Sequence, residues 1–163
     1  MLDETLKNAK ILVVDDQEAN IDILVGLLEI QGYTNIKSTT HPRTVLSTFK
    51  LFEPDLVLLD LMMPHFSGFE IMGQLKGLIP PGNYLPVMVI TADITIEAKQ
   101  RAMALGAKDF LSKPLDLHEV SLRIKNLLYT RYLQQQLEYV TQILAGRKPA
   151  DTITSAEPEV TVD

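Results

Sequence analysis

Four apolar runs in this chain each lead into polar or charged residues, and no other feature constrains the fold as strongly. The runs occupy residues 11–14, 55–59, 86–90 and 110–111, and the polar residues at their ends are Asp15, Asp16, Asp60, Thr91 and Lys113. Short unbroken stretches of Val, Ile and Leu are typical of strands covered on both faces, as in a parallel sheet between layers of helices. Ligands of such sheets bind beyond the carboxyl ends of the strands. We therefore expect these polar side chains to gather at one edge of a parallel sheet.

Strand and helix patterns alternate along most of the chain. Strands are expected at the four apolar runs, the last of them spanning residues 109–112, and at residues 35–39. Apolar residues at helical spacing predict helices over residues 21–30, 42–49, 69–75 and 96–105. Asn20 is expected to cap the first helix, and residues 61–68 and 79–84 are expected to form loops. Five alternations of strand and helix predict an open, doubly wound α/β domain.

Composition narrows the class of protein. The chain has 163 residues, of which 46% are hydrophobic and 22% charged, so it can form one folded domain with an appendage. It has no cysteine, which excludes disulfides, thiolate metal sites and cysteine nucleophiles. The net charge of −6 argues against direct binding of nucleic acid. No apolar run approaches the roughly 20 residues that span a bilayer, so we expect a cytoplasmic protein without a membrane anchor.

The last predicted helix is unusually long. It starts near Asp116 and meets neither Pro nor Gly until Gly146, which gives roughly 45 Å of helix. A domain of this size is only about 30–35 Å across, so we expect the far end to project. The apolar residues of this end follow the spacing of a short coiled-coil seam: Leu133, Leu137, Val140 and Leu144. The seam favours a homodimer, and the alternative is a helix that folds back on its own domain or frays. Residues 147–163 have the composition of a disordered tail.

A cluster of Asp15, Asp16 and Asp60 would need a positive charge, because neighbouring carboxylates repel one another and raise each other's pKa. With only oxygen ligands on offer, Mg²⁺ is the expected occupant, and Mn²⁺ could substitute for it. Lys113 and Thr91 would add an ammonium group and a hydroxyl group. The residues therefore predict an anion site beside a divalent cation.

A carboxylate in such a place can attack phosphorus and form an acyl phosphate. Asp60 is the expected nucleophile because it stands alone at the end of the most apolar strand. Asp15 and Asp16 form a pair suited to holding the metal. Lys113 and Thr91 would then take up charge on the transferring group.

In their order and separations, these residues resemble the response-regulator receiver domain of two-component signalling. The matching motifs are Val13-Val14-Asp15-Asp16, Leu58-Leu59-Asp60-Leu61-Met62-Met63-Pro64 followed by Gly68, Ile90-Thr91-Ala92, and Lys113-Pro114. The resemblance implies a receiver domain over residues 9–128, after a lead at residues 1–8 and before a helical extension at residues 129–146. It also implies a flavodoxin-like (βα)5 sandwich, with five parallel strands in the order 2-1-3-4-5 and an elongated last helix.

The resemblance implies a role in metal binding for four residues. Asp60 would be the phosphoacceptor as well as a metal ligand, Asp16 would bind Mg²⁺ directly, and Asp15 would bind it through water. The backbone carbonyl of Met62 would be a further ligand. Because the Met62 side chain cannot orient an attacking water by a hydrogen bond, we expect slow self-dephosphorylation.

Four other residues would bind the phosphoryl group or respond to it, and Pro114 would shape the turn beside them. Thr91, the Ala92 amide and Lys113 would contact phosphoryl oxygens, and Lys113-Pro114 resembles the cis-peptide turn of the family. Phe110 stands at the aromatic switch position, where its ring would turn inward when Thr91 moves toward the phosphoryl group. Ordinary core packing is the other interpretation of Phe110.

The resemblance implies phosphotransfer from a sensor histidine kinase or a histidine phosphotransfer protein to a switch that acts on an unknown protein effector. Beyond phosphoryl acceptance and self-dephosphorylation, no enzyme activity is expected. A phosphatase of the haloacid-dehalogenase type is an alternative with different chemistry, but such enzymes carry an acid/base Asp where Met62 stands. Two further alternatives are a constitutive interaction module and a fragment of a larger regulator whose output domain has been removed.

Overall fold

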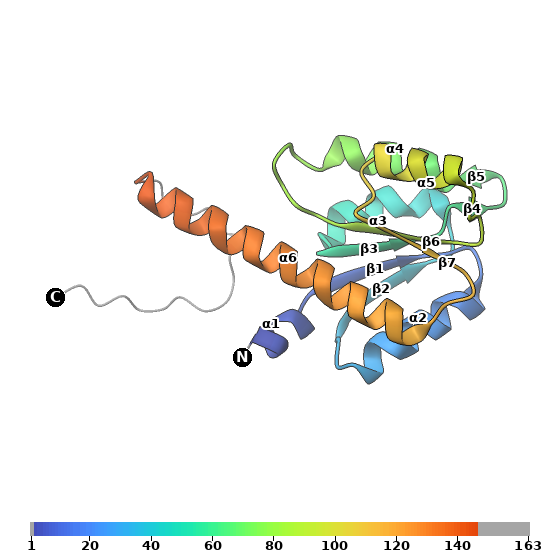
Figure 1. Ribbon diagram of the computed structural model, residues 1–163, viewed down its shortest axis with the longest axis horizontal. Helices are drawn as coiled ribbons and strands as arrows, with labels where there is room; N and C mark the ends of the chain where they lie inside the picture. The colour runs from blue at the N-terminus through green and yellow to red at the C-terminus, as the bar shows by residue number, and fades with distance from the viewer. Residues whose placement is uncertain (1, 147–163) are drawn as a thin grey trace. The chain divides into compact units, whose positions relative to one another are not determined.

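Five parallel strands form the central sheet, in the order β2-β1-β3-β6-β7 (Figure 1). The strands are β1 (Lys10–Val14), β2 (Asn35–Thr39), β3 (Leu56–Leu59), β6 (Val87–Thr91) and β7 (Asp109–Ser112). Counted along the parallel sheet alone, this is the order 2-1-3-4-5, so the predicted fold is confirmed. The computed structural model describes residues 2–146, and the predicted tail at residues 147–163 lies outside them.

Helices cover both faces of the sheet (Figure 1). One face carries α2 (Glu18–Ile30) and the first turns of α6 (Leu117–Leu144), and the other carries α3 (Val45–Phe52), α4 (Gly68–Leu78) and α5 (Ile96–Ala104). Successive residues of a strand point to opposite faces, so β1 supplies Ile11 to one apolar cluster and Leu12 to the other. Both clusters are fully buried at the central strands, which explains why those strands are apolar without alternation.

The first long helix begins earlier than expected, and the prediction that Asn20 caps it is wrong. The N-cap of α2 is Gln17, whose backbone is extended, and Asn20 lies within the first turn. The backbone amides of Asn20 and Ile21 both donate to the Gln17 carbonyl, at 3.1 and 3.2 Å. The side chain of Asn20 is therefore not needed for capping, and it turns toward Asp15.

Four short elements were not predicted as such. A helix α1 (Leu2–Lys7) occupies the lead, a 3-10 turn η1 (Pro42–Thr44) precedes α3, and β4 (Met62–Met63) pairs with β5 (Phe66–Ser67) inside the predicted loop. Leu6 of α1 is buried in the same core cluster as α2 and α6, and Asp3 lies 3.2 Å from Lys125. Acidic residues in its first turn and Lys7 in its last turn are the signals that could have revealed this helix.

The last helix has the expected start and length. The Asp116 carboxylate accepts hydrogen bonds from the backbone amides of His118 and Glu119, so it is the N-cap of α6, as predicted. The chain divides into two compact units, Met1–Tyr132 and Leu133–Asp163, and α6 runs from the first into the second. Within the first unit, α6 buries its apolar side chains in the core: Val120, Ile124, Leu127 and Leu128.

Arg131 fixes the last turn of α6 inside the first unit. Its Nε donates to Asp55 Oδ1 at 2.8 Å, and its Nη1 donates to the Tyr84 carbonyl at 2.7 Å. The other carboxylate oxygen of Asp55 accepts from the backbone amide of Lys10 at 2.8 Å. Asp55 directly precedes β3, and Tyr84 lies in the loop that leads to β6. Arg131 therefore ties α6 to the starts of the two strands that end at Asp60 and Thr91.

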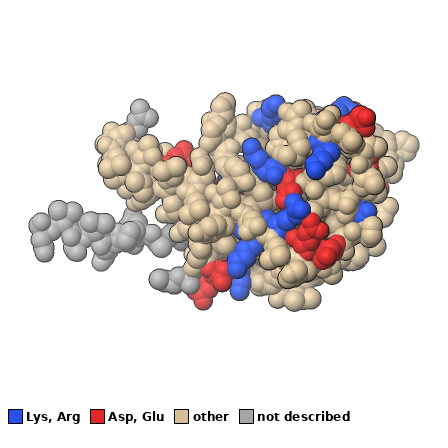
Figure 2. All heavy atoms as spheres, in the orientation of Figure 1, with Lys and Arg blue, Asp and Glu red and all other residues tan. Residues whose placement is uncertain are grey.

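The surface bears charges of both signs. On the face seen in Figure 2, Lys and Arg side chains are interspersed with Asp and Glu side chains over the first unit, and they do not form a separate basic surface. Among residues 2–146, none of the helices combines the length and the hydropathy needed to cross a bilayer.

Candidate functional site

The three predicted carboxylates meet at the carboxyl ends of the central strands. One oxygen from each of Asp15, Asp16 and Asp60 lies within 4.8 Å of the other two. Asp15 and Asp16 directly follow β1, and Asp60 directly follows β3, which pairs with β1 in parallel. The register Val14↔Leu59 brings the residues after the two strands side by side. The cleft around Asp16 and Asp60 has a volume of about 800 Å³.

Lys113 bridges two of these carboxylates. Its Nζ lies 2.8 Å from Asp15 Oδ2 and 3.1 Å from Asp60 Oδ2. Burial by itself would lower the pKa of the Lys113 ammonium group, but the hydrogen bond to Asp15 and the negative charges of Asp60 and Asp15 outweigh burial and raise the pKa. Lys113 therefore stays positively charged in the cleft, as an anion site requires.

Asp16 differs from the other two carboxylates in its hydrogen bonding. Its Oδ1 atom is buried and accepts no hydrogen bond from any group in residues 2–146. Burial, followed by repulsion from Asp15 and Asp60, raises the pKa of the Asp16 carboxyl group. A buried carboxylate oxygen without a donor, beside two further carboxylates, is the environment that a hard divalent cation would stabilise. The three carboxylates thus fit Mg²⁺, and Asp16 is the one that the ion would stabilise most.

Asp60 is held in place by the backbone around it. Its Oδ1 accepts from the Met62 amide at 3.0 Å, and its own amide donates to the Val14 carbonyl at 3.0 Å. The N-terminus of α4 also approaches this segment closely. A Cβ atom at Gly68 would lie 2.6 Å from the Asp60 carbonyl oxygen and 2.6 Å from Leu61 Cα. Only glycine allows α4 to begin so close to Asp60.

The predicted switch residues lie on the two neighbouring strands β6 and β7. Thr91 is fully buried at the end of β6, and its Oγ1 accepts from the Asp93 amide at 3.3 Å. Phe110 is half-buried on β7, opposite Val89, and packs against the apolar cluster on the face of α4 and α5. Thr91 and Phe110 are thus two residue positions apart along the paired strands, as a coupled pair would need to be.

The remaining predicted residues surround the cleft. Ala92 and Met62 both line it, and 56% of Met62 is exposed at its mouth. The Lys113-Pro114 peptide bond is cis, as the resemblance implied. The cleft is lined by five of the residues that were expected to bind the metal or the phosphoryl group: Asp16, Asp60, Met62, Ala92 and Lys113. Asp15 contacts Lys113 there, and Thr91 is buried at the end of β6.

Sequence reasoning missed several residues of the site. Gln17 and Asn20 line the cleft beside Asp16, and the hairpin β4–β5 adds Met63, Pro64 and Phe66 as an apolar wall. The hairpin has no strand-length pattern that could have predicted it. Asn20 had a recognisable signal, because a polar amide in the first turn after an acidic strand end can face that end.

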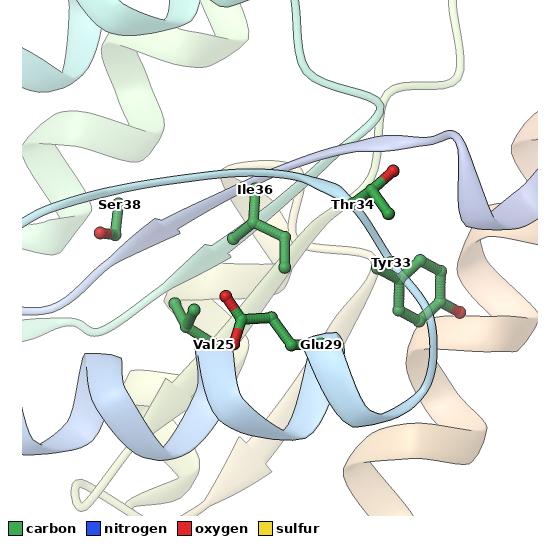
Figure 3. A pocket seen from close by; sticks show the side chains of 6 residues that line it. All are labelled: Val25, Glu29, Tyr33, Thr34, Ile36 and Ser38. Carbon is green, nitrogen blue, oxygen red and sulfur yellow. The ribbon is translucent and has the colours of Figure 1, made fainter.

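A second hollow, of about 370 Å³, lies between α2 and β2. Figure 3 shows its six lining side chains, which come from α2, the turn after it and β2: Val25, Glu29, Tyr33, Thr34, Ile36 and Ser38. None of the predicted site residues lines it. It is separate from the cleft that holds the carboxylates.

Comparisons with known proteins agree with the geometry. The family model described as response regulator receiver domain matches residues 11–125. Transcriptional regulatory protein YvrH of Bacillus subtilis is 33% identical over 131 residues, which are 80% of this chain and 54% of that protein. Response regulator PleD of Caulobacter vibrioides is 36% identical over 120 residues, which are 74% of this chain and 26% of that protein. The chain thus spans about half or less of these two relatives.

The fold has close counterparts among solved structures. A response regulator receiver domain protein, CheY-like, from Methanospirillum hungatei superposes with a TM-score of 0.71 over 78% of this chain and 98% of that chain. The two sequences are 24% identical, so this likeness shows the shared fold alone.

Proposed function

Because the chain belongs to the response regulator receiver domain family, we propose that it accepts a phosphoryl group on Asp60. The donor would be the phosphohistidine of a sensor histidine kinase or of a histidine phosphotransfer protein. The observation that carries the proposal is the position of Asp60, which is buried at the end of β3, 3.1 Å from Lys113 and within reach of two further carboxylates. The cytoplasmic location expected from the sequence belongs to the same proposal.

In the proposed reaction, a carboxylate oxygen of Asp60 attacks phosphorus and the bond from phosphorus to the imidazole nitrogen breaks. The phosphoryl group moves to Asp60 as an acyl phosphate, and the imidazole takes up a proton from solvent. Lys113 would exchange its contact with Asp60 for one with a phosphoryl oxygen while keeping its bond to Asp15. Since Lys113 stays protonated, it can offset the negative charge that collects there.

A divalent ion held by Asp16, Asp60 and the Met62 carbonyl would screen the carboxylate from the phosphoryl oxygens, and Asp15 would contribute through water. Mg²⁺ is the proposed ion, and Mn²⁺ is the proposed substitute. Family membership supports this proposal together with the unpaired oxygen of Asp16.

The proposed output begins at Thr91. Its buried hydroxyl group would move toward the phosphoryl group and, with the Ala92 amide, donate to it. The space left behind would admit the ring of Phe110, which is half-buried on the adjacent strand. The surface beside β7 would then change shape and alter contacts with a protein effector.

We also propose that the acyl phosphate persists. The Met62 side chain stands at the mouth of the cleft, where its thioether has no hydrogen-bond donor and is too weak an acceptor to orient an attacking water. The same residue argues against a phosphatase of the haloacid-dehalogenase type, which would need an acid/base Asp there. The chain would therefore act as a switch and have no enzyme activity beyond phosphoryl acceptance and self-dephosphorylation.

Protein contacts, including contacts with a second copy through α6, are the proposed output. The chain covers 54% of YvrH and 26% of PleD, so the activities of those whole proteins are not assigned to it.

Labelling with acetyl phosphate tests the proposal. Intact mass spectrometry should show one added phosphoryl group in the presence of Mg²⁺ and none after Asp60→Asn. Asp22→Asn makes the same chemical change on the exposed side of α2 and should label like the natural chain. Full labelling of Asp60→Asn on the peptide that contains residue 60, or equal labelling with and without Mg²⁺, would overturn the proposal.

A further inference from the structure

We propose that Asn20 is a positioning residue that holds Asp15 in the orientation needed for Mg²⁺ binding. Asn20 was predicted as a helix cap and does not act as one. Its Nδ2 lies 3.3 Å from Asp15 Oδ1, at the side of the cleft. The inference rests on the metal site of the proposed function and adds to it a residue outside the carboxylate cluster.

The orientation of the Asn20 amide follows from its neighbours. An ionised carboxylate can only accept hydrogen bonds, so the atom that faces Asp15 must be the amide nitrogen. The same nitrogen lies 3.3 Å from Gln17 Oε1. Both hydrogens of the Asn20 amide therefore have acceptors, and Gln17 keeps the amide turned toward Asp15.

Of the three carboxylates of the cleft, Asp15 accepts the most hydrogen bonds. Its Oδ1 accepts from the Gln17 amide at 2.9 Å and from Asn20, and its Oδ2 accepts from Lys113 at 2.8 Å. Asp16, the next residue, has one oxygen with no donor at all in the described part of the chain. This difference assigns the two neighbours different tasks, because Asp16 has a free oxygen for direct coordination whereas both oxygens of Asp15 already have donors.

The contact with Asn20 matters because the terminal torsion of an Asp side chain is broad and weakly restrained. Lys113 restrains Oδ2, but Lys113 must also serve the phosphoryl group at Asp60. A donor on Oδ1 that takes no part in phosphotransfer keeps the Asp15 carboxylate fixed throughout. Groups that orient metal ligands from outside the first coordination sphere usually affect metal affinity for this reason.

Calorimetric titration with Mg²⁺ tests the inference on the full chain. For Asn20→Ala we expect a Kd about three- to ten-fold higher, below the roughly 10- to 100-fold effect of well-aligned outer-shell partners, because the contact is long at 3.3 Å. Asn20→Gln keeps an amide donor and should recover part of the affinity. Asn20→Leu has a similar size and no donor, and should match Asn20→Ala, so it serves if the alanine variant folds poorly.

Asn126→Ala is the matched control, since Asn126 is an exposed helical asparagine far from the cleft in sequence. Asn126→Ala should leave the Kd for Mg²⁺ within about two-fold. Without Mg²⁺, both alanine variants should have a free energy of unfolding at least as high as that of the natural chain, because alanine favours helix. In acetyl phosphate labelling, Asn20→Ala should raise the Mg²⁺ concentration at half-maximal rate and leave the rate at saturating Mg²⁺ within about two-fold.

The outcomes separate the inference from the proposed function. If the natural chain binds no Mg²⁺, both fail. If the natural chain binds Mg²⁺ and Asn20→Ala binds it equally well or more tightly, only the positioning role of Asn20 is wrong. An equal loss of affinity in Asn126→Ala would likewise overturn it.

Discussion

At the scale of single residues, the cleft gathers more negative charge than its own cation can balance. Lys113 contacts Asp15 and Asp60, whereas within residues 2–146 the buried Oδ1 of Asp16 has neither a cation nor a hydrogen-bond donor. Burial and repulsion raise the pKa of Asp16, which means that its charged form is disfavoured in the folded chain. Without the metal, the negative charge of Asp16 therefore destabilises the fold.

Replacing Asp16 by a neutral residue should remove this destabilisation and also the increase in stability that Mg²⁺ brings. We expect Asp16→Asn to raise the free energy of unfolding without Mg²⁺ by about 1 kcal/mol, the upper end for a partly exposed pair of charges, because the neutral amide is not repelled by Asp15 and Asp60. The same variant should lose the stabilisation that Mg²⁺ gives the natural chain. Urea unfolding with and without Mg²⁺ measures both effects, and a less stable metal-free variant would contradict the prediction.

At the scale of elements, the site depends on how closely α4 approaches the end of β3. Ser67 caps α4, with its hydroxyl oxygen accepting from the Phe69 amide at 3.2 Å, and Gly68 lets the first turn pass against the backbone of Asp60. The helix and the acceptor strand cannot shift independently, because there is no free space between them.

Two glycines of α4 should respond in opposite ways to alanine. We expect Gly68→Ala to lower the free energy of unfolding by about 2 kcal/mol, within the usual cost of overpacking, and to slow labelling of Asp60. Gly73→Ala lies in the same helix with open space around it and should stabilise the chain by about 0.5–1 kcal/mol. Urea unfolding of both variants measures these changes. If Gly68→Ala left the free energy of unfolding unchanged, the close contact at Gly68 would not be restrictive.

Arg131 should contribute more to stability than the other arginine of the same helix. Its side chain is 11% exposed and bonded to Asp55 and the Tyr84 carbonyl, whereas the Arg123 side chain is 40% exposed beside Asp109 and Glu119. We expect Arg131→Met, which keeps the apolar stem, to cost about 2 kcal/mol.

Arg123→Met is the control and should cost about 0.5 kcal/mol, as surface ion pairs do. A double-mutant cycle with Asp55→Asn should show coupling for Arg131 and none for Arg123. Equal losses for the two arginines would mean that burial of the Arg131 contacts does not matter.

At the scale of the whole molecule, the far half of α6 has an apolar seam that the rest of residues 2–146 leaves exposed. The four residues of the seam remain 47%, 62%, 49% and 83% exposed: Leu133, Leu137, Val140 and Leu144. Glu138 is the only charged residue between Leu133 and Gly146, so little charge opposes pairing with an identical helix. Contiguous exposed apolar side chains of this kind mark interaction surfaces, which favours a partner.

We predict that α6 makes a homodimer through this seam and that its strength responds to phosphorylation. Leu137→Glu should raise the dissociation constant at least about 100-fold, or about 2.8 kcal/mol. Gln135→Glu adds the same charge on the opposite side of the helix and should change the dissociation constant little. Analytical ultracentrifugation with and without beryllofluoride, a mimic of the acyl phosphate, provides the measurement. A monomer in both conditions would rule out the dimer.

Patterns in the sequence were enough to predict the class of fold and the residues that gather at one edge of the sheet. Unbroken apolar strands can be stable only inside a covered parallel sheet, and the carboxyl ends of parallel strands meet at one edge. Asp15, Asp16, Asp60, Thr91 and Lys113 were predictable for this reason. The sheet order followed from the resemblance to receiver domains, and the N-cap at Asp116 from the start of the helical pattern.

Contacts between residues distant in sequence became visible in the folded chain and could not be predicted. No periodicity predicts that Arg131 reaches Asp55, that Gly68 passes against Asp60, or that Asn20 donates to Asp15 instead of capping its helix. Local patterns report which face of an element is buried. The partner of a polar group depends on where the elements pack, because any acceptor within about 3 Å can satisfy it.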